Sequence, residues 1–67
     1  MKKKPSRLII YAPDVQNITG RNIGTCYRIL KKVRIYFGKK TKSLVTIPEF
    51  AEFMDIPEEL VREFMIT

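Results

Sequence analysis

Three proline-containing segments mark where helices can begin in this 67-residue chain. Each places an apolar residue before the proline and an acid after it. Proline suits the first turn of a helix, because its missing N–H would have no partner there in any case. The segments are Ala12-Pro13-Asp14, Ile47-Pro48-Glu49 and Ile56-Pro57-Glu58. Each of them predicts a helix that starts at or close to its proline.

The second and third segments also fit the capping-box pattern. Thr46 with Glu49, and Asp55 with Glu58, have the spacing at which two side chains bond to each other's free backbone N–H groups. We therefore expect a short helix after each pair. The first of these helices should bury Ile47, Phe50, Ala51 and Met54, and the second should bury Leu60, Val61, Phe64 and Met65.

A longer helix is expected from Asn22 to Phe37. Asn22 is a favoured N-cap residue, and the shorter helix before it, from Pro13 to about Ile18, would end at Gly20 in a left-handed conformation. Apolar residues recur at helical spacing through the longer helix and mark one buried stripe. That stripe consists of Cys26, Ile29, Leu30, Val33 and Phe37.

The end of the longer helix admits a second interpretation. Ile35-Tyr36-Phe37 can instead form a strand, with Gly38 to Ser43 as the loop of a hairpin, which would make a wing. The helical period continues unbroken through Phe37, and this favours a helix that Gly38 ends. Lys39 to Ser43 would then be a basic polar loop.

These elements predict a mainly α fold. We expect a compact four-helix domain with a helix-turn-helix, made of two helix pairs, with two very short strands at 8–10 and 44–46. Residues 1–7 would be a flexible basic arm and residues 8–67 a single domain, with a basic pair at 12–38 and an acidic pair at 46–66. One helix pair cannot bury its own apolar face, so the two pairs should share one core. Its members would be Phe50, Leu60, Val61 and Phe64 packed on Val15, Ile18, Ile29 and Val33.

Charge divides the chain into two parts of opposite sign. Up to Leu44 there are twelve Lys and Arg residues and one acid, Asp14, so the net charge is +11. From Val45 onward there are six acids and one base, Arg62, so the net charge is −5. Such asymmetry indicates contact between the basic part and a nucleic acid.

The residue types that the chain lacks exclude several kinds of site. There is no His and only one cysteine, Cys26, so an internal disulfide and a zinc cage are excluded and a reducing compartment is indicated. No segment approaches the roughly 20 apolar residues of a membrane span, and the apolar run behind Met1 to Lys4 is too short for a signal peptide. We therefore expect a cytoplasmic protein without membrane contact, catalytic activity, metal site or cofactor.

The expected turn between the first two helices suggests where a nucleic acid would bind. A short helix, the turn Thr19-Gly20-Arg21 and a longer helix make a helix-turn-helix, whose second helix enters the major groove of DNA. Asn22 and Arg28 can bond base edges with two atoms, and Gly24 would let the backbone approach the DNA closely. The candidate DNA-binding residues are Arg21, Asn22, Gly24, Thr25, Tyr27, Arg28, Lys31, Lys32, Lys39, Lys40 and Lys42.

Two stretches of this part carry a resemblance to known proteins. Ile18-Thr19-Gly20-Arg21, followed by Tyr27-Arg28-Ile29-Leu30-Lys31-Lys32-Val33, resembles the turn and second helix of small helix-turn-helix proteins of the excisionase and MerR-like group. Val45-Thr46-Ile47-Pro48-Glu49-Phe50 with Leu60-Val61 resembles their second helical pair. The resemblance implies a DNA-binding protein of a kind often encoded on mobile elements.

The sequence is therefore compatible with two functions. The first is sequence-specific binding of double-stranded DNA, as a small transcription regulator or an excisionase-type recombination factor with helix 22–37 in the major groove. The second is a protein-interaction module, an antirepressor or adaptor, that acts through its acidic C-terminal helices. Residues 49–66 would then form the contact with a protein partner or with a second copy in a homodimer.

Overall fold

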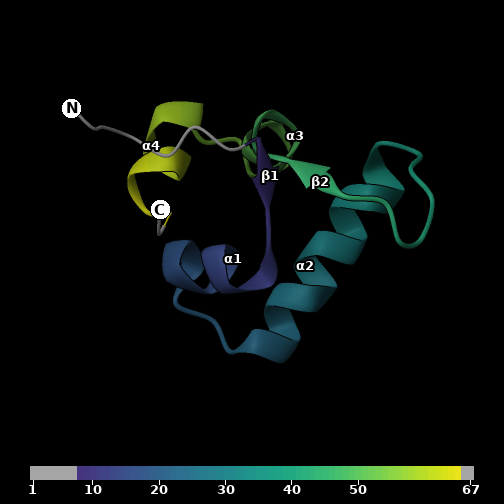
Figure 1. The fold of residues 1–67 in the computed structure, drawn as a ribbon, viewed down its shortest axis with the longest axis horizontal. Coiled ribbons are helices and arrows are strands. Elements are labelled where there is room, and N and C mark those ends of the chain that lie inside the picture. Colours follow the sequence, from purple (N-terminus) through teal and green to yellow (C-terminus); the bar gives the residue numbers. More distant parts are fainter. Residues whose placement is uncertain (1–7, 66–67) are drawn as a thin grey trace.

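The fold consists of four helices and a two-stranded antiparallel ribbon (Figure 1). A computed structural model describes residues 8–65. The mainly α fold expected from the sequence is confirmed. In chain order the elements are β1 (Ile9–Ile10), α1 (Ala12–Thr19), α2 (Ile23–Tyr36), β2 (Val45–Thr46), α3 (Ile47–Met54) and α4 (Glu58–Glu63).

The ribbon joins the two helix pairs. Ile9 lies opposite Thr46 and Ile10 opposite Val45, and the N–H of Ile47 donates to the carbonyl of Leu8 at 2.8 Å. Ile10 and Val45, which face each other, are almost fully buried. Because α3 follows β2 directly and α1 follows β1 after one residue, the ribbon sets the starting points of both helix pairs.

A single core is shared by both pairs. The fully buried side chains include Val15 of α1, Val33 of α2, Phe50 of α3 and Val61 of α4. Ile18 and Ile29 are partly buried against the same cluster. The acidic pair therefore completes the core of the basic pair, as expected, and holds α1 and α2 in place.

Most helix ends follow the local signals in the sequence. The side-chain oxygen of Asn22 accepts from the N–H of Thr25 at 2.9 Å at the start of α2. Gly20 ends α1 at φ 74°, a left-handed conformation that costs glycine little. At the start of α3, Glu49 accepts from the N–H of Thr46 at 3.0 Å, and Thr46 accepts from the N–H of Glu49 at 3.2 Å. This capping box is confirmed.

The second expected capping box is wrong. Asp55 is the C-cap of α3, in a left-handed conformation at φ 59°, and α4 begins only at Glu58 with Pro57 as its N-cap. The helix before Asp55 continues to Met54, and Phe53 and Met54 in its last turn are partly buried against the core. Asp55 therefore ends α3 in a left-handed conformation, and Pro57 is the N-cap of α4 instead.

The expected burial of Leu60 and Phe64 is also wrong. Leu60 is 46% exposed and Phe64 is 52% exposed. Because α4 has only six residues, just one of them, Val61, is buried, and Met65 fills the core after the helix has ended. The two large side chains therefore point outward from α4 and its C-cap.

The helical interpretation of 35–37 is correct. α2 runs to Tyr36, with Phe37 as its C-cap, so Ile35-Tyr36-Phe37 is not a strand and the alternative of a wing hairpin is wrong. The proposed arm at 1–7, with Lys2 to Lys4 and Arg7, lies outside the described residues, and so do residues 66 and 67. Between residues 8 and 65, none of the helices has the length and apolar character needed to cross a membrane.

Candidate nucleic-acid interface

The turn between α1 and α2 is held by side-chain hydrogen bonds. The hydroxyl of Thr19 donates to the carbonyl of Val15 at 2.9 Å and accepts from the N–H of Arg21 at 3.2 Å. From within α2, the thiol of Cys26 approaches the carbonyl of Arg21 at 3.7 Å. Together with Gly20, these contacts fix the path of the chain from the end of α1 to the start of α2.

One line of residues on α2 points directly away from the core. Cys26, Leu30 and Val33 face inward and are buried. The opposite line follows positions i, i+4, i+7 and i+11, which stack above one another on a helix. Its members are Gly24, Arg28, Lys31 and Ile35, all of which are exposed.

Two further exposed residues flank this line. Tyr27, 62% exposed, lies on one side of it, and Lys32 lies on the other. At the start of the helix Asn22 is exposed, but its side-chain oxygen is engaged with the N–H of Thr25, and Thr25 itself is half-buried. The side-chain NH₂ group of Asn22 makes no hydrogen bond with a residue between 8 and 65 and can contact a ligand.

The loop after α2 is tied down at two points. The side-chain Nε of Arg34 donates to the carbonyl of Ser43 at 2.6 Å, and Nζ of Lys39 lies 2.9 Å and 3.0 Å from the two carboxylate oxygens of Glu49. Between these anchors Lys40 and Lys42 are exposed. The loop thus presents two lysines in a defined position although it is not a hairpin.

Most basic side chains of this surface form no ion pair with a described residue. Two bases pair with a described acid: Lys39 with Glu49 and Arg62 with Glu58, each at 2.9 Å. The six exposed bases form no ion pair with any residue between 8 and 65: Arg21, Arg28, Lys31, Lys32, Lys40 and Lys42. Their charge is available to an anionic partner.

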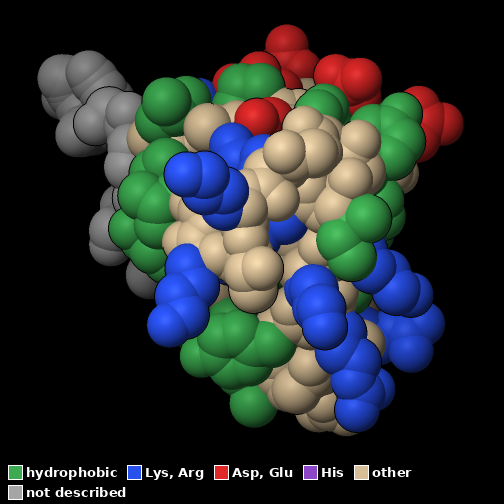
Figure 2. Space-filling model, turned by 90° about the vertical axis from the view of Figure 1, so that its right-hand side faces the viewer, with side chains coloured by type: hydrophobic (Ala, Val, Ile, Leu, Met, Phe, Trp, Pro, Cys, Tyr) green, Lys and Arg blue, Asp and Glu red, His purple; other side chains and the backbone are tan. Residues whose placement is uncertain are grey.

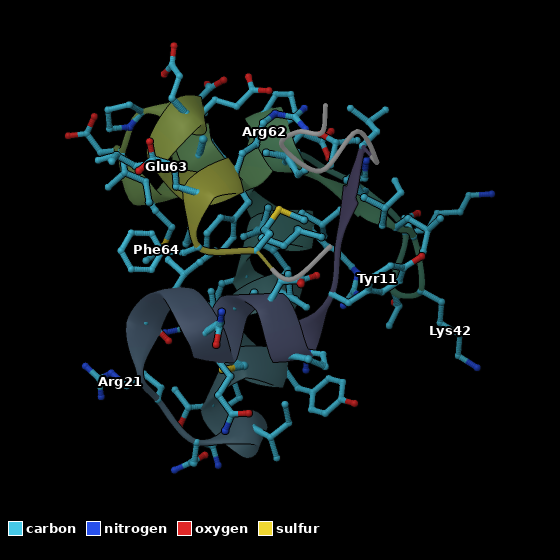
Figure 3. All side chains as sticks on the ribbon, turned by 60° about the vertical axis from the view of Figure 1, so that its left-hand side comes forward. Tyr11, Arg21, Lys42, Arg62, Glu63 and Phe64 are labelled. Atoms are coloured by element: carbon cyan, nitrogen blue, oxygen red, sulfur yellow. The ribbon has the colours of Figure 1, made fainter. Side chains whose placement is uncertain are left out.

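The bases and acids occupy different regions of the surface. Figure 2 views the molecule from the side of α2 and shows Lys and Arg side chains over its middle and lower parts, with Asp and Glu along the top, where α3 and α4 lie. Figure 3 shows how far the basic residues extend: Arg21 lies beside the turn between α1 and α2, and Lys42 lies on the opposite side of that view. An elongated polyanion would suit such a distribution.

Most of the candidate DNA-binding residues are exposed on this surface, but two of them are partly buried. Lys39 is engaged by Glu49, with its side chain only 23% exposed, and Thr25 is half-buried. Arg34, which is not among the candidate DNA-binding residues, positions the loop through Ser43. No local pattern marks that contact, because it joins residues nine positions apart across the end of a helix.

Glu49, which pairs with Lys39, has a shifted pKa. The pKa of Glu49 is held below its ordinary value of 4.5, chiefly by the hydrogen bond from the backbone N–H of Thr46; partial burial opposes this and Lys39 adds to it. Among residues 8–65, no group of three or more Cys, Asp or Glu side chains is arranged to hold a metal ion. Cys26 is a buried free thiol on the core side of α2.

Comparisons with protein-family models, with curated proteins and with solved structures gave no match to this chain. The resemblance to the excisionase and MerR-like group therefore stays an expectation from the sequence.

Proposed function

We propose that this protein binds double-stranded DNA in a sequence-specific manner, with α2 in the major groove. The observation that carries the proposal is the outward line of α2: its bases are exposed, have no ion-pair partner among the described residues, and lie opposite the side chains that fix the helix to the core. α2 is the second helix of a helix-turn-helix pair, the element that occupies the major groove in proteins of that class.

The residues on α2 would divide between reading bases and holding phosphates. Arg28 is suited to two hydrogen bonds with a guanine, and the NH₂ group of Asn22 can donate to a base edge. Tyr27, Lys31 and Lys32 would contact phosphates, which position the helix but carry no sequence information.

Gly24 supports this orientation. A Cβ atom at this position would meet only the side-chain oxygen of Asn22, at an ordinary contact distance of 3.5 Å. Nothing within the described part of the protein therefore requires glycine there, although glycine inside a helix costs up to about 1 kcal/mol relative to alanine. A close approach of the helix backbone to DNA would account for it.

The loop would extend the contact along the duplex. Lys40 and Lys42 lie past the C-terminal end of α2, which at 14 residues is about 21 Å long. Contacts at both ends of the helix would then reach phosphates on either side of the groove. Lys39 would contribute less, because Glu49 already neutralises it.

The biological role proposed for this binding is that of a small cytoplasmic transcription regulator or an excisionase-type recombination factor. A chain of this size would act by occupying a DNA site, and we propose no catalytic activity for it.

A salt-dependent titration tests the proposal. Fluorescence anisotropy of a labelled random-sequence duplex should show binding at 50 mM salt. Neutralising about five phosphates should weaken it by two to three orders of magnitude at about 200 mM salt, because each neutralised phosphate releases counterions. Selection from a random duplex pool should then enrich a shared site. Failure to bind duplex DNA at low salt would contradict the proposal.

The second candidate, a protein-interaction module, is favoured by one specific observation. Leu60 and Phe64 are large apolar side chains that lie exposed beside the acidic residues of α4. This observation does not compete with DNA binding, because α4 and α2 lie on different sides of the molecule (Figure 1).

A further inference from the structure

Leu60 and Phe64 form an outward-facing apolar pair. They lie four residues apart at α4 and its C-cap, a spacing that places side chains on one face of a helix. The neighbouring Val61 is 0% exposed and Met65 is 6% exposed. The segment thus divides into an inner face that fills the core and an outer face that shows two large apolar groups to solvent.

The position of Phe64 is fixed by the residues around it. Its N–H donates to the carbonyl of Val61 at 3.2 Å, and its own carbonyl accepts from the side-chain amide of Asn17 in α1 at 2.6 Å. The N–H of Met65 donates to the carbonyl of Arg62 at 3.2 Å. Figure 3 shows the ring of Phe64 at the edge of the molecule, between α4 and α1. These bonds hold the backbone that carries the exposed ring, so the segment loses little backbone freedom when a partner covers it.

Acidic side chains flank the apolar pair. Glu59 precedes Leu60, Glu63 precedes Phe64, and both are exposed. The one base in α4, Arg62, has its charge neutralised by Glu58 at 2.9 Å. The surface made of Glu59, Leu60 and Phe64, here called the α4 surface, is therefore apolar at its centre, and it belongs to the part of the chain whose net charge is −5.

We propose that the α4 surface docks a basic amphipathic helical segment of another protein. Apolar side chains of that segment would cover Leu60 and Phe64, and its Lys or Arg residues would face Glu59 and the negative charge of the chain from Val45 onward. Charge complementarity selects this occupant over a symmetric second copy, because a two-fold contact would place the glutamates of one copy against those of the other.

The size of the α4 surface and its place in the fold agree with this occupant. Two anchoring side chains suit a short helix, since interfaces between whole domains require about 20 residues a side. α4 lies on the side of the molecule away from α2 (Figure 1), so a partner and DNA can be bound together. The proposal rests on the geometry of α4 and is independent of DNA binding.

A peptide titration followed by NMR tests this proposal. The probe is a synthetic 14-residue helix of about equal numbers of leucine and lysine, with leucines on one face, added to the ¹⁵N-labelled full chain. The comparison probe is the same peptide with glutamate in place of lysine. We expect saturable amide shifts in residues 59–65 with the basic peptide and none with the acidic one.

Matched variants separate the α4 surface from general attraction to acids. Leu60→Ser with Phe64→Ser should raise the Kd for the basic peptide by at least about tenfold. Leu44 is 55% exposed and directly precedes β2. Leu44→Ser should leave the Kd for the basic peptide unchanged. Equal binding by the double variant, shifts centred on other residues, or no binding would overturn the proposal.

Sedimentation of the unliganded chain tests the competing occupant. The protein should be monomeric, and the double serine variant should sediment in the same way. A dimer that the double variant converts to a monomer would show that a second copy covers the α4 surface, which would also overturn the proposal.

Discussion

Lys39 and Glu49 join the basic part of the chain to the acidic part. Nζ of Lys39 lies within 3.0 Å of both carboxylate oxygens of Glu49, and one of these oxygens also accepts the N–H of Thr46 at 3.0 Å. A single carboxylate thus caps α3 and holds the loop that follows α2. This contact fixes Lys40 and Lys42 relative to the exposed face of α2.

Replacement of Glu49 should make the stability depend on pH in a defined way. Because the folded-state pKa of Glu49 is lowered, its contribution is present above its ordinary pKa of 4.5 and is lost as the pH falls through the lowered value. Glu49→Gln should therefore reduce the free energy of unfolding by about 0.5–1 kcal/mol near pH 7. Urea denaturation should show this deficit shrinking as the pH falls from about 6 to about 2.5.

Glu52→Gln is the matched control for that measurement. Glu52 is exposed on the same helix, and its side chain makes no hydrogen bond or ion pair with a residue between 8 and 65. Its replacement should change the stability by less than about 0.5 kcal/mol. A pH-independent deficit in Glu49→Gln would contradict the role assigned to the carboxylate.

Two single substitutions should separate base reading from phosphate binding. Arg28→Ala should lower affinity for a selected site by about 1–3 kcal/mol and relax sequence preference, because Arg28 lies at the centre of the outward line of α2. Lys40→Ala should weaken binding to all duplexes alike and reduce the salt slope by about one. Anisotropy titrations against the selected site and a scrambled duplex distinguish the two, and identical behaviour of both variants would contradict the assignment.

Gly24→Ala should move stability and binding in opposite directions. The added Cβ has room, so the free energy of unfolding should rise by up to about 1 kcal/mol. The same methyl group would obstruct a close approach of α2 to DNA, so affinity should fall. Thermal denaturation and anisotropy on the same sample test both effects. Unchanged DNA affinity would show that the helix backbone at this point does not approach the duplex.

The two left-handed helix ends should respond oppositely to substitution. Asp55 adopts φ 59° and Gly20 adopts φ 74°, a region that costs most residues with a Cβ about 1–2 kcal/mol. Gly20→Ala should therefore destabilise the fold by about 1 kcal/mol, whereas Asp55→Gly should be neutral or stabilise it by up to about 1 kcal/mol. If Asp55 instead capped α4, Asp55→Gly would destabilise the fold. Urea denaturation of the variant distinguishes these two results.

The sequence predicted the parts of the structure that depend on neighbouring residues. Asn22 and Thr46 begin their helices because each side chain bonds three positions ahead in the chain. The buried stripe of α2 follows from its period alone. Both signals act within one or two helical turns, so neither requires knowledge of the rest of the fold.

The parts that were wrong or missed depend on distant contacts. Asp55 fits the pattern of an N-cap, but it adopts the left-handed conformation that ends α3, whose last residues, Phe53 and Met54, pack against the core. The exposure of Leu60 follows from how α4 lies on the core, which no local pattern contains. The link from Lys39 to Glu49 likewise joins residues ten positions apart across a loop.

Central to this account is the claim that the outward face of α2 binds duplex DNA. The most direct test is a proton–nitrogen NMR titration of the full chain with a duplex selected from a random pool, at low salt. We predict amide shifts concentrated in residues 21–32, with smaller shifts at Lys40 and Lys42 and none in residues 59–65. No shifts, or shifts confined to α3 and α4, would contradict the claim.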